Sequence, residues 1–166
     1  MNAIEIARKM ETDAIRFYLE ASEKTSHPVG KKMFLGIVED EKNHLHMLTQ
    51  ILQGLDITMR DVLPMENIKT IFLTMKDKMI ERIKATSNDL EAFKIAMEME
   101  KEGIAFYTKA AGEAKTVKEK DLFARLAKEE QQHHDIFANT YSFMNNTGDW
   151  FMWEEQSIVD GGTPWA

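Results

Sequence analysis

The residues with the clearest chemical potential are two Glu-x-x-His motifs, Glu41–His44 and Glu130–His133. Side chains three positions apart lie on one face of an α-helix, so each motif can present a carboxylate and an imidazole to one point. A further glutamate, Glu11 or Glu100, precedes each motif by the same interval of 30 residues. Carboxylate oxygen and imidazole nitrogen are ligands of divalent transition metals. The pattern predicts a metal site built from both halves of the chain.

The two halves are copies of each other at an offset of 89 residues. Residues 3–21 and 92–110 share nine identities over 19 aligned positions without a gap, including the pairs Phe17-Tyr18 and Phe106-Tyr107. A self-similarity with one fixed offset indicates internal duplication. The same offset selects Glu130 rather than its neighbour Glu129 as the partner of Glu41, and His133 as the partner of His44.

Long amphipathic helices must carry these residues, at about 2–24, 31–53, 89–112 and 118–145. In each of them apolar residues recur every three or four positions, and the glutamates and histidines replace apolar residues in the middle of the stripe. Asn2 with Glu5, and Asn88 with Glu91, predict capping boxes at two helix starts. Gly54 predicts a C-terminal cap after the second helix.

The loop at 25–30 is short, which makes the first two helices antiparallel neighbours. Residues 54–88 contain Pro64 and an amphipathic second half, and they predict a long crossover with one or two short helices. We therefore expect an all-α fold, a four-helix bundle of two duplicated helical hairpins, over residues 1–148. Residues 149–166 begin with an aromatic run and predict a short C-terminal helix or arm that packs on the bundle or on a second subunit.

Four glutamates inside such a core repel one another and lack water. Two divalent cations would supply four positive charges against four carboxylates, while the two imidazoles bind as neutral ligands. Charge balance therefore favours two ions over one. Mixed oxygen and nitrogen ligands favour iron or manganese, and zinc can also occupy such sites.

Composition excludes several other classes of site. The sequence has no cysteine, so this chain holds no disulfide, thiolate metal site or iron–sulfur cluster. Its net charge is −7 and it has no basic stripe, which argues against nucleic acid or an anionic membrane surface as a partner. No apolar run is long enough to span a membrane, and we expect a cytoplasmic protein.

Over about residues 2–145 the chain resembles the rubrerythrin branch of the ferritin-like superfamily. The resemblance rests on Glu11 with Phe17-Tyr18, Glu100 with Phe106-Tyr107, and the two Glu-x-x-His motifs. It implies a ferritin-like bundle with a di-iron carboxylate site. Glu41 and Glu130 would then bridge the two metals, and Glu11 with His44, and Glu100 with His133, would complete them.

The chain departs from that family in two respects. It has no cysteines for the rubredoxin-type iron domain of rubrerythrins, so electrons would come from an external donor protein. It has Gly103 where the family carries a further glutamate, which leaves a symmetric site. Tyr18 and Tyr107 lie two turns after Glu11 and Glu100, and they could hydrogen-bond the ligands, donate electrons or simply pack in the core. Asp40 and Glu129 could orient the histidines, with Asp40 supporting His133 across the bundle.

The leading functional prediction is an oxidoreductase in which a diferrous site reduces hydrogen peroxide or dioxygen. The alternatives are a ferroxidase and a non-catalytic iron-binding or storage protein. A homodimer is predicted rather than a large cage, since no clear fifth helix follows the bundle.

Overall fold

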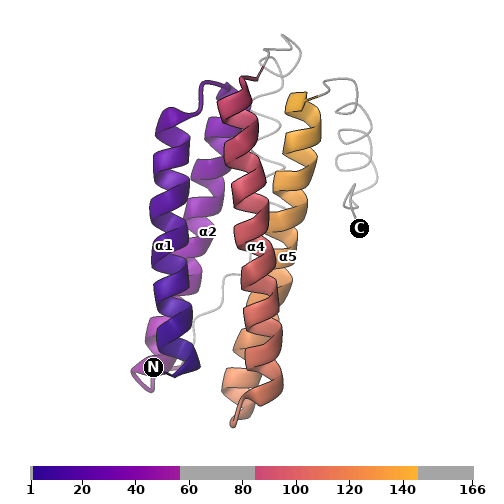
Figure 1. The fold of residues 1–166 in the computed structure, drawn as a ribbon. Helices are drawn as coiled ribbons and strands as arrows, with labels where there is room; N and C mark the ends of the chain where they lie inside the picture. Colours follow the sequence, from indigo (N-terminus) through magenta and orange to yellow (C-terminus); the bar gives the residue numbers. More distant parts are fainter. Residues whose placement is uncertain (1, 57–84, 146–166) are drawn as a thin grey trace, which may run out of the picture.

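The computed structural model describes residues 2–56 and 85–145. They form the helices α1 (Ala3–Lys24), α2 (Pro28–Leu52), α4 (Ser87–Glu113) and α5 (Val117–Asn145). Figure 1 shows these helices side by side, with α1 and α4 on the near side and α2 and α5 behind them. Most packing occurs within each hairpin, between α1 and α2 and between α4 and α5. The predicted four-helix bundle is therefore confirmed, and no described helix is long and apolar enough to cross a membrane.

The helix ends follow the local sequence. Asn2 and Glu5 form the predicted capping box at the start of α1, and Gly54 has a positive φ of 72° just after α2. Two expectations were wrong. α2 begins at Pro28 rather than at 31, because proline suits the first turn of a helix, where its missing N–H has no partner to lose. The capping box of α4 is formed by Thr86 and Asp89 rather than by Asn88 and Glu91.

Asp89 also fastens the first hairpin to the second. Its carboxylate accepts hydrogen bonds from the backbone N–H of Ser26 at 2.9 Å and from the Ser26 hydroxyl at 2.8 Å. It also accepts one from the backbone N–H of Thr86 at 3.0 Å. One buried carboxylate thus holds the α1–α2 loop against the start of α4.

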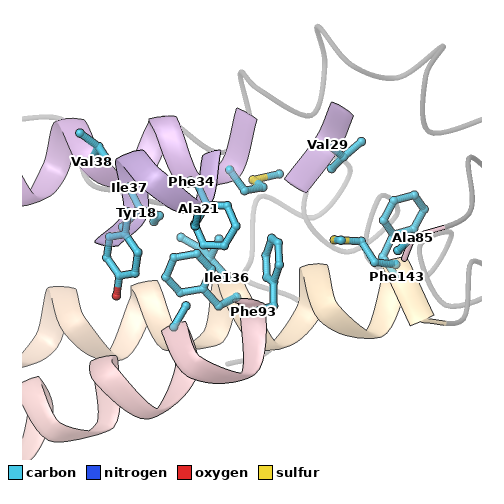
Figure 2. Packing of buried hydrophobic residues seen from close by; sticks show 14 residues of the cluster. Tyr18, Ala21, Val29, Phe34, Ile37, Val38, Ala85, Phe93, Ile136 and Phe143 are labelled. Atoms are coloured by element: carbon cyan, nitrogen blue, oxygen red, sulfur yellow. The ribbon is translucent and has the colours of Figure 1, made fainter. Parts of the chain in front are cut away.

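Two apolar clusters fill the bundle, one at each end. Figure 2 shows the first, in which the rings of Tyr18, Phe34 and Phe93 lie between the two hairpins. The second contains Leu122, Phe123 and other residues toward the opposite end of the helices. Phe34 of the first cluster and Phe123 of the second occupy equivalent positions of the repeat, 89 residues apart. This is expected for hairpins related by a pseudo-two-fold axis. The polar residues of the repeat lie between the clusters, midway along each helix.

The predicted crossover helices fall largely on 57–84, outside the described residues. The predicted boundary at 148 and the aromatic arm at 149–166 lie outside them as well.

Candidate metal centre

The structure brings the six predicted ligand residues together in the middle of the bundle. Each is at most 5% exposed: Glu11, Glu41, His44, Glu100, Glu130 and His133. They form two overlapping groups whose ligand atoms lie within 4.8 Å of one another. One group contains Glu11 and His44, the other contains Glu100 and His133, and both share Glu41 and Glu130. Two such groups could hold two neighbouring cations that share two carboxylates.

In the first group, His44 directs its Nδ1 atom at three carboxylates. This atom lies 2.9 Å from Glu41 Oε2, 3.0 Å from Glu130 Oε1 and 3.4 Å from Glu11 Oε1. The three carboxylates come from three helices, α1, α2 and α5, which meet at this nitrogen.

The second group repeats the pattern around His133. Its Nδ1 atom lies 3.3 Å from Glu41 Oε1 and 3.6 Å from Glu100 Oε2. The two imidazole rings lie 5.5 Å apart, centre to centre, at an interplanar angle of 19°. Glu41 therefore faces His44 with one oxygen and His133 with the other, as a bridging carboxylate would.

The unpaired atoms of this cluster fit a metal centre. Among the metal-facing atoms, both oxygens of Glu41, one oxygen each of Glu100 and Glu130, and the Nδ1 atoms of both histidines are buried without a hydrogen-bond partner among the described residues, and so is the outer nitrogen Nε2 of His44. A buried polar group without a partner costs about 1–3 kcal/mol. Divalent cations would satisfy the metal-facing atoms together, so the residues fit the di-metal site implied by the ligand pattern.

The outer nitrogen of each histidine faces a carboxylate from the other hairpin. His133 Nε2 lies 3.3 Å from Asp40 Oδ2, so the predicted contact is present. His44 Nε2 lies 3.6 Å from Glu129 Oε1. A carboxylate at Nε2 favours a proton on that nitrogen and leaves Nδ1 free to bind a metal.

The two tyrosines hydrogen-bond across the repeat. The Tyr18 hydroxyl donates to Glu100 Oε1, and the Tyr107 hydroxyl donates to Glu11 Oε1. Burial raises the pKa of both tyrosines well above the usual value, and the nearby glutamates add to this effect. Both phenols therefore remain protonated donors, each held against the glutamate of the opposite hairpin.

In the absence of metal the cluster retains protons. Burial raises the pKa of Glu11 to about 8, and the Glu41 carboxylate adds to the rise. Burial also raises the pKa of Glu130 well above its usual range, together with repulsion from Glu100 and Glu41. Burial would raise the pKa of Glu41 as well, but the two histidines outweigh it and lower that pKa.

The histidines complete this balance. Burial disfavours their charged forms, yet the surrounding carboxylates raise the pKa of both His44 and His133 well above the usual value. Protons thus provide the positive charge that the carboxylates require. A bound cation must displace them, because metal ligands bind in their deprotonated forms.

A cavity of about 160 Å³ leads from the surface to the centre between α1 and α4. Its lining consists of repeat-related pairs: Met10 and Met99, Glu11 and Glu100, Asp13 and Glu102, Ala14 and Gly103, Tyr18 and Tyr107, Glu41 and Glu130. The Asp13 side chain is 46% exposed, and Glu102 is exposed, so these two acids lie at the mouth. At roughly 30 Å³ per water, the cavity has room for a few small molecules beside the bridging glutamates.

Gly103 is one of two positions where the cavity lining departs from the repeat, the other being Glu102. The repeat partner of Gly103 is Ala14. A Cβ atom at position 103 would lie 3.0 Å from Glu130 Oε2, closer than ordinary van der Waals contact. Because Gly103 has no side chain, the Glu130 carboxylate lies beside it without a steric clash.

Sequence reasoning missed Arg125. Its Nε atom donates to Glu129 Oε2 at 2.7 Å. The spacing of four residues on one helix was a usable signal, because such pairs face each other. The acidic pair at the cavity mouth was also missed, since the sequence does not show which helix faces enclose a cavity.

Comparison with known proteins agrees with this geometry. No match was found among curated proteins or among solved structures. The family model described as rubrerythrin matches residues 2–141, which is most of the chain. The chain belongs to the rubrerythrin family.

Proposed function

We propose that this protein binds two iron ions and uses them to reduce hydrogen peroxide or dioxygen. The observation that carries the proposal is the pair of buried four-residue groups that share Glu41 and Glu130. In this proposal the shared glutamates bridge the two ions. Glu11 and His44 complete one position, and Glu100 and His133 complete the other. Manganese or zinc would fit the same donor atoms.

Two iron(II) ions would supply two electrons, which with two protons reduce hydrogen peroxide to two water molecules or dioxygen to hydrogen peroxide. The protein's own contribution is to hold the ligands, limit access and place protonated groups nearby. The cavity between α1 and α4 suits an oxidant of two oxygen atoms. Tyr18 and Tyr107 border that cavity as buried hydrogen-bond donors to Glu100 and Glu11.

In this proposal, electrons that restore the reduced state come from an external donor protein. The homodimer and the cytoplasmic location stay predictions.

A ferroxidase role is the second candidate, and the cavity mouth favours it. Asp13 and Glu102 place acidic groups where iron(II), arriving as substrate, would enter. In that role Fe²⁺ would be the substrate, dioxygen or hydrogen peroxide would accept its electrons, and Fe³⁺ would be the product.

Stopped-flow mixing separates these functions. The diferrous protein, with and without excess Fe²⁺, is mixed anaerobically with excess hydrogen peroxide, and in a parallel experiment with dioxygen in excess. We expect oxidation by peroxide that finishes within one turnover and resumes only when a reductant is added. Continued oxidation of excess iron(II) without a reductant would instead identify a ferroxidase. No reaction with either oxidant would contradict both roles and leave iron binding alone.

A further inference from the structure

The two halves of the centre present the same metal-facing residues but differ behind the histidines. In one half the outer nitrogen of His133 faces Asp40 at 3.3 Å. In the other half the outer nitrogen of His44 faces Glu129 at 3.6 Å. Because the hairpin is duplicated, the two histidine–carboxylate contacts can be compared within one bundle.

Arg125 is a second difference between them. Glu129 lies between two groups, with Oε1 toward His44 and Oε2 accepting from Arg125 at 2.7 Å. The Glu129 side chain is only 5% exposed and that of Arg125 is 26% exposed, so solvent screens this ion pair weakly. The repeat partner of Arg125 is Gly36, a buried residue of α2 without a side chain. The first hairpin therefore has no arginine at the position equivalent to 125.

The charge of Glu129 is thus divided between an imidazole and a guanidinium. The Arg125 guanidinium, at 2.7 Å, and the His44 imidazole, at 3.6 Å, compete for the Glu129 carboxylate. A carboxylate behind a histidine strengthens the metal bond by making the imidazole more basic. Arg125 and the longer distance both weaken that support for His44.

We propose that the two metal positions differ in affinity, and that Arg125 is the positioning residue that lowers the affinity of the His44 position relative to the His133 position. The inference rests on the proposed di-metal site and goes beyond it by ranking its two halves. The first ion occupies the position with His133 and Glu100, and the second occupies the position with His44 and Glu11.

The test is an anaerobic titration of the metal-free protein with Co²⁺, followed by visible absorption in the presence of a competing chelator. Even identical adjacent positions would fill in two steps, because the ions repel each other. The diagnostic result is therefore the change caused by substitutions. Arg125→Met should tighten the second step by up to about tenfold, Glu129→Gln should weaken it about 10–100-fold, and Asp40→Asn should weaken the first step by a similar factor.

Lys128→Met is the matched control. It removes one positive charge from an exposed position of the same helix and should leave both steps unchanged. The first position is identified with one equivalent of Zn²⁺, by the ring ¹⁵N signals of the histidines. The Nδ1 signal of His133 should shift before that of His44.

The outcomes separate the two proposals. Failure of the wild-type protein to bind two ions would overturn the proposed di-metal site itself. Two bound ions with both steps unchanged in Arg125→Met, or equal first shifts of the two histidines, would overturn only the ranking. A lower unfolding temperature of Arg125→Met with unchanged binding would show that Arg125 serves the fold and not the metal.

Discussion

Replacing Gly103 with alanine should stabilise the metal-free protein and weaken metal binding. Glycine inside a helix costs about 0.5–1 kcal/mol relative to alanine. The new methyl group would lie 3.0 Å from Glu130 Oε2. Without metal, the end of the Glu130 side chain can move by a few tenths of an ångström, so most of the helix gain should remain.

A bound metal removes that freedom, because Glu130 is then fixed by coordination. Overpacking of a fixed group costs about 1–3 kcal/mol. We therefore expect Gly103→Ala to be up to about 1 kcal/mol more stable than the wild type without metal. With metal, we expect binding of at least one ion to weaken about tenfold, which corresponds to roughly 1.4 kcal/mol.

The assay combines urea unfolding of the metal-free protein with the anaerobic Co²⁺ titration. Gly112→Ala is the matched control, since it lies on the same helix and its added Cβ would meet nothing within 4 Å. The control should gain stability without a change in affinity. Equal metal affinities for Gly103→Ala and Gly112→Ala would refute the reasoning, because Glu130 would then not be held beside position 103.

Three further predictions concern protons and hydrogen bonds. The pKa of Glu11 is raised from 4.5 to about 8 in the folded protein, so its contribution to stability is complete below pH 4.5 and is lost as the pH rises to about 8. Urea unfolding should show this loss for the metal-free protein only, and adding Zn²⁺ at pH 7 should release protons measurable in weak buffer. Tyr107→Phe leaves Glu11 Oε1 without its donor and should lower the free energy of unfolding of the metal-free protein by about 1–3 kcal/mol, and an unchanged value would contradict the hydrogen bond. Asp89→Asn should cost about 2–3 kcal/mol at pH 7 through its bonds to Ser26. Because the pKa of Asp89 is lowered in the folded state, this difference should shrink as the pH falls below about 4, and a constant difference would contradict the role of its charge.

The repeat explains why so much of the centre was predictable. Glu41 and Glu130 interrupt apolar stripes at equivalent positions, so duplication of one hairpin brings them together without further information. The contact between Asp40 and His133 was predicted from the resemblance to ferritin-like proteins, in which an acidic residue beside a ligand supports a histidine across the bundle.

The remaining features depend on packing that periodicity does not specify. Tyr18 bonds to Glu100 rather than to Glu11 because it reaches across to the opposite hairpin, and its sequence position two turns after Glu11 indicated only a shared face. The start of α4 was misplaced because Thr86 and Asp89 compete with Asn88 and Glu91 as equally plausible caps. Asp89 prevails in the structure, where its carboxylate also binds Ser26.

The central claim is that the shared carboxylates Glu41 and Glu130 hold two metal ions in one chain. Anaerobic equilibrium dialysis of the metal-free protein against Fe²⁺ tests it most directly. We expect two ions per wild-type chain, and loss of both from a Glu41→Ala/Glu130→Ala double variant that remains helical by circular dichroism. Fewer than two ions in the wild type, or two ions still bound by the double variant, would contradict the account.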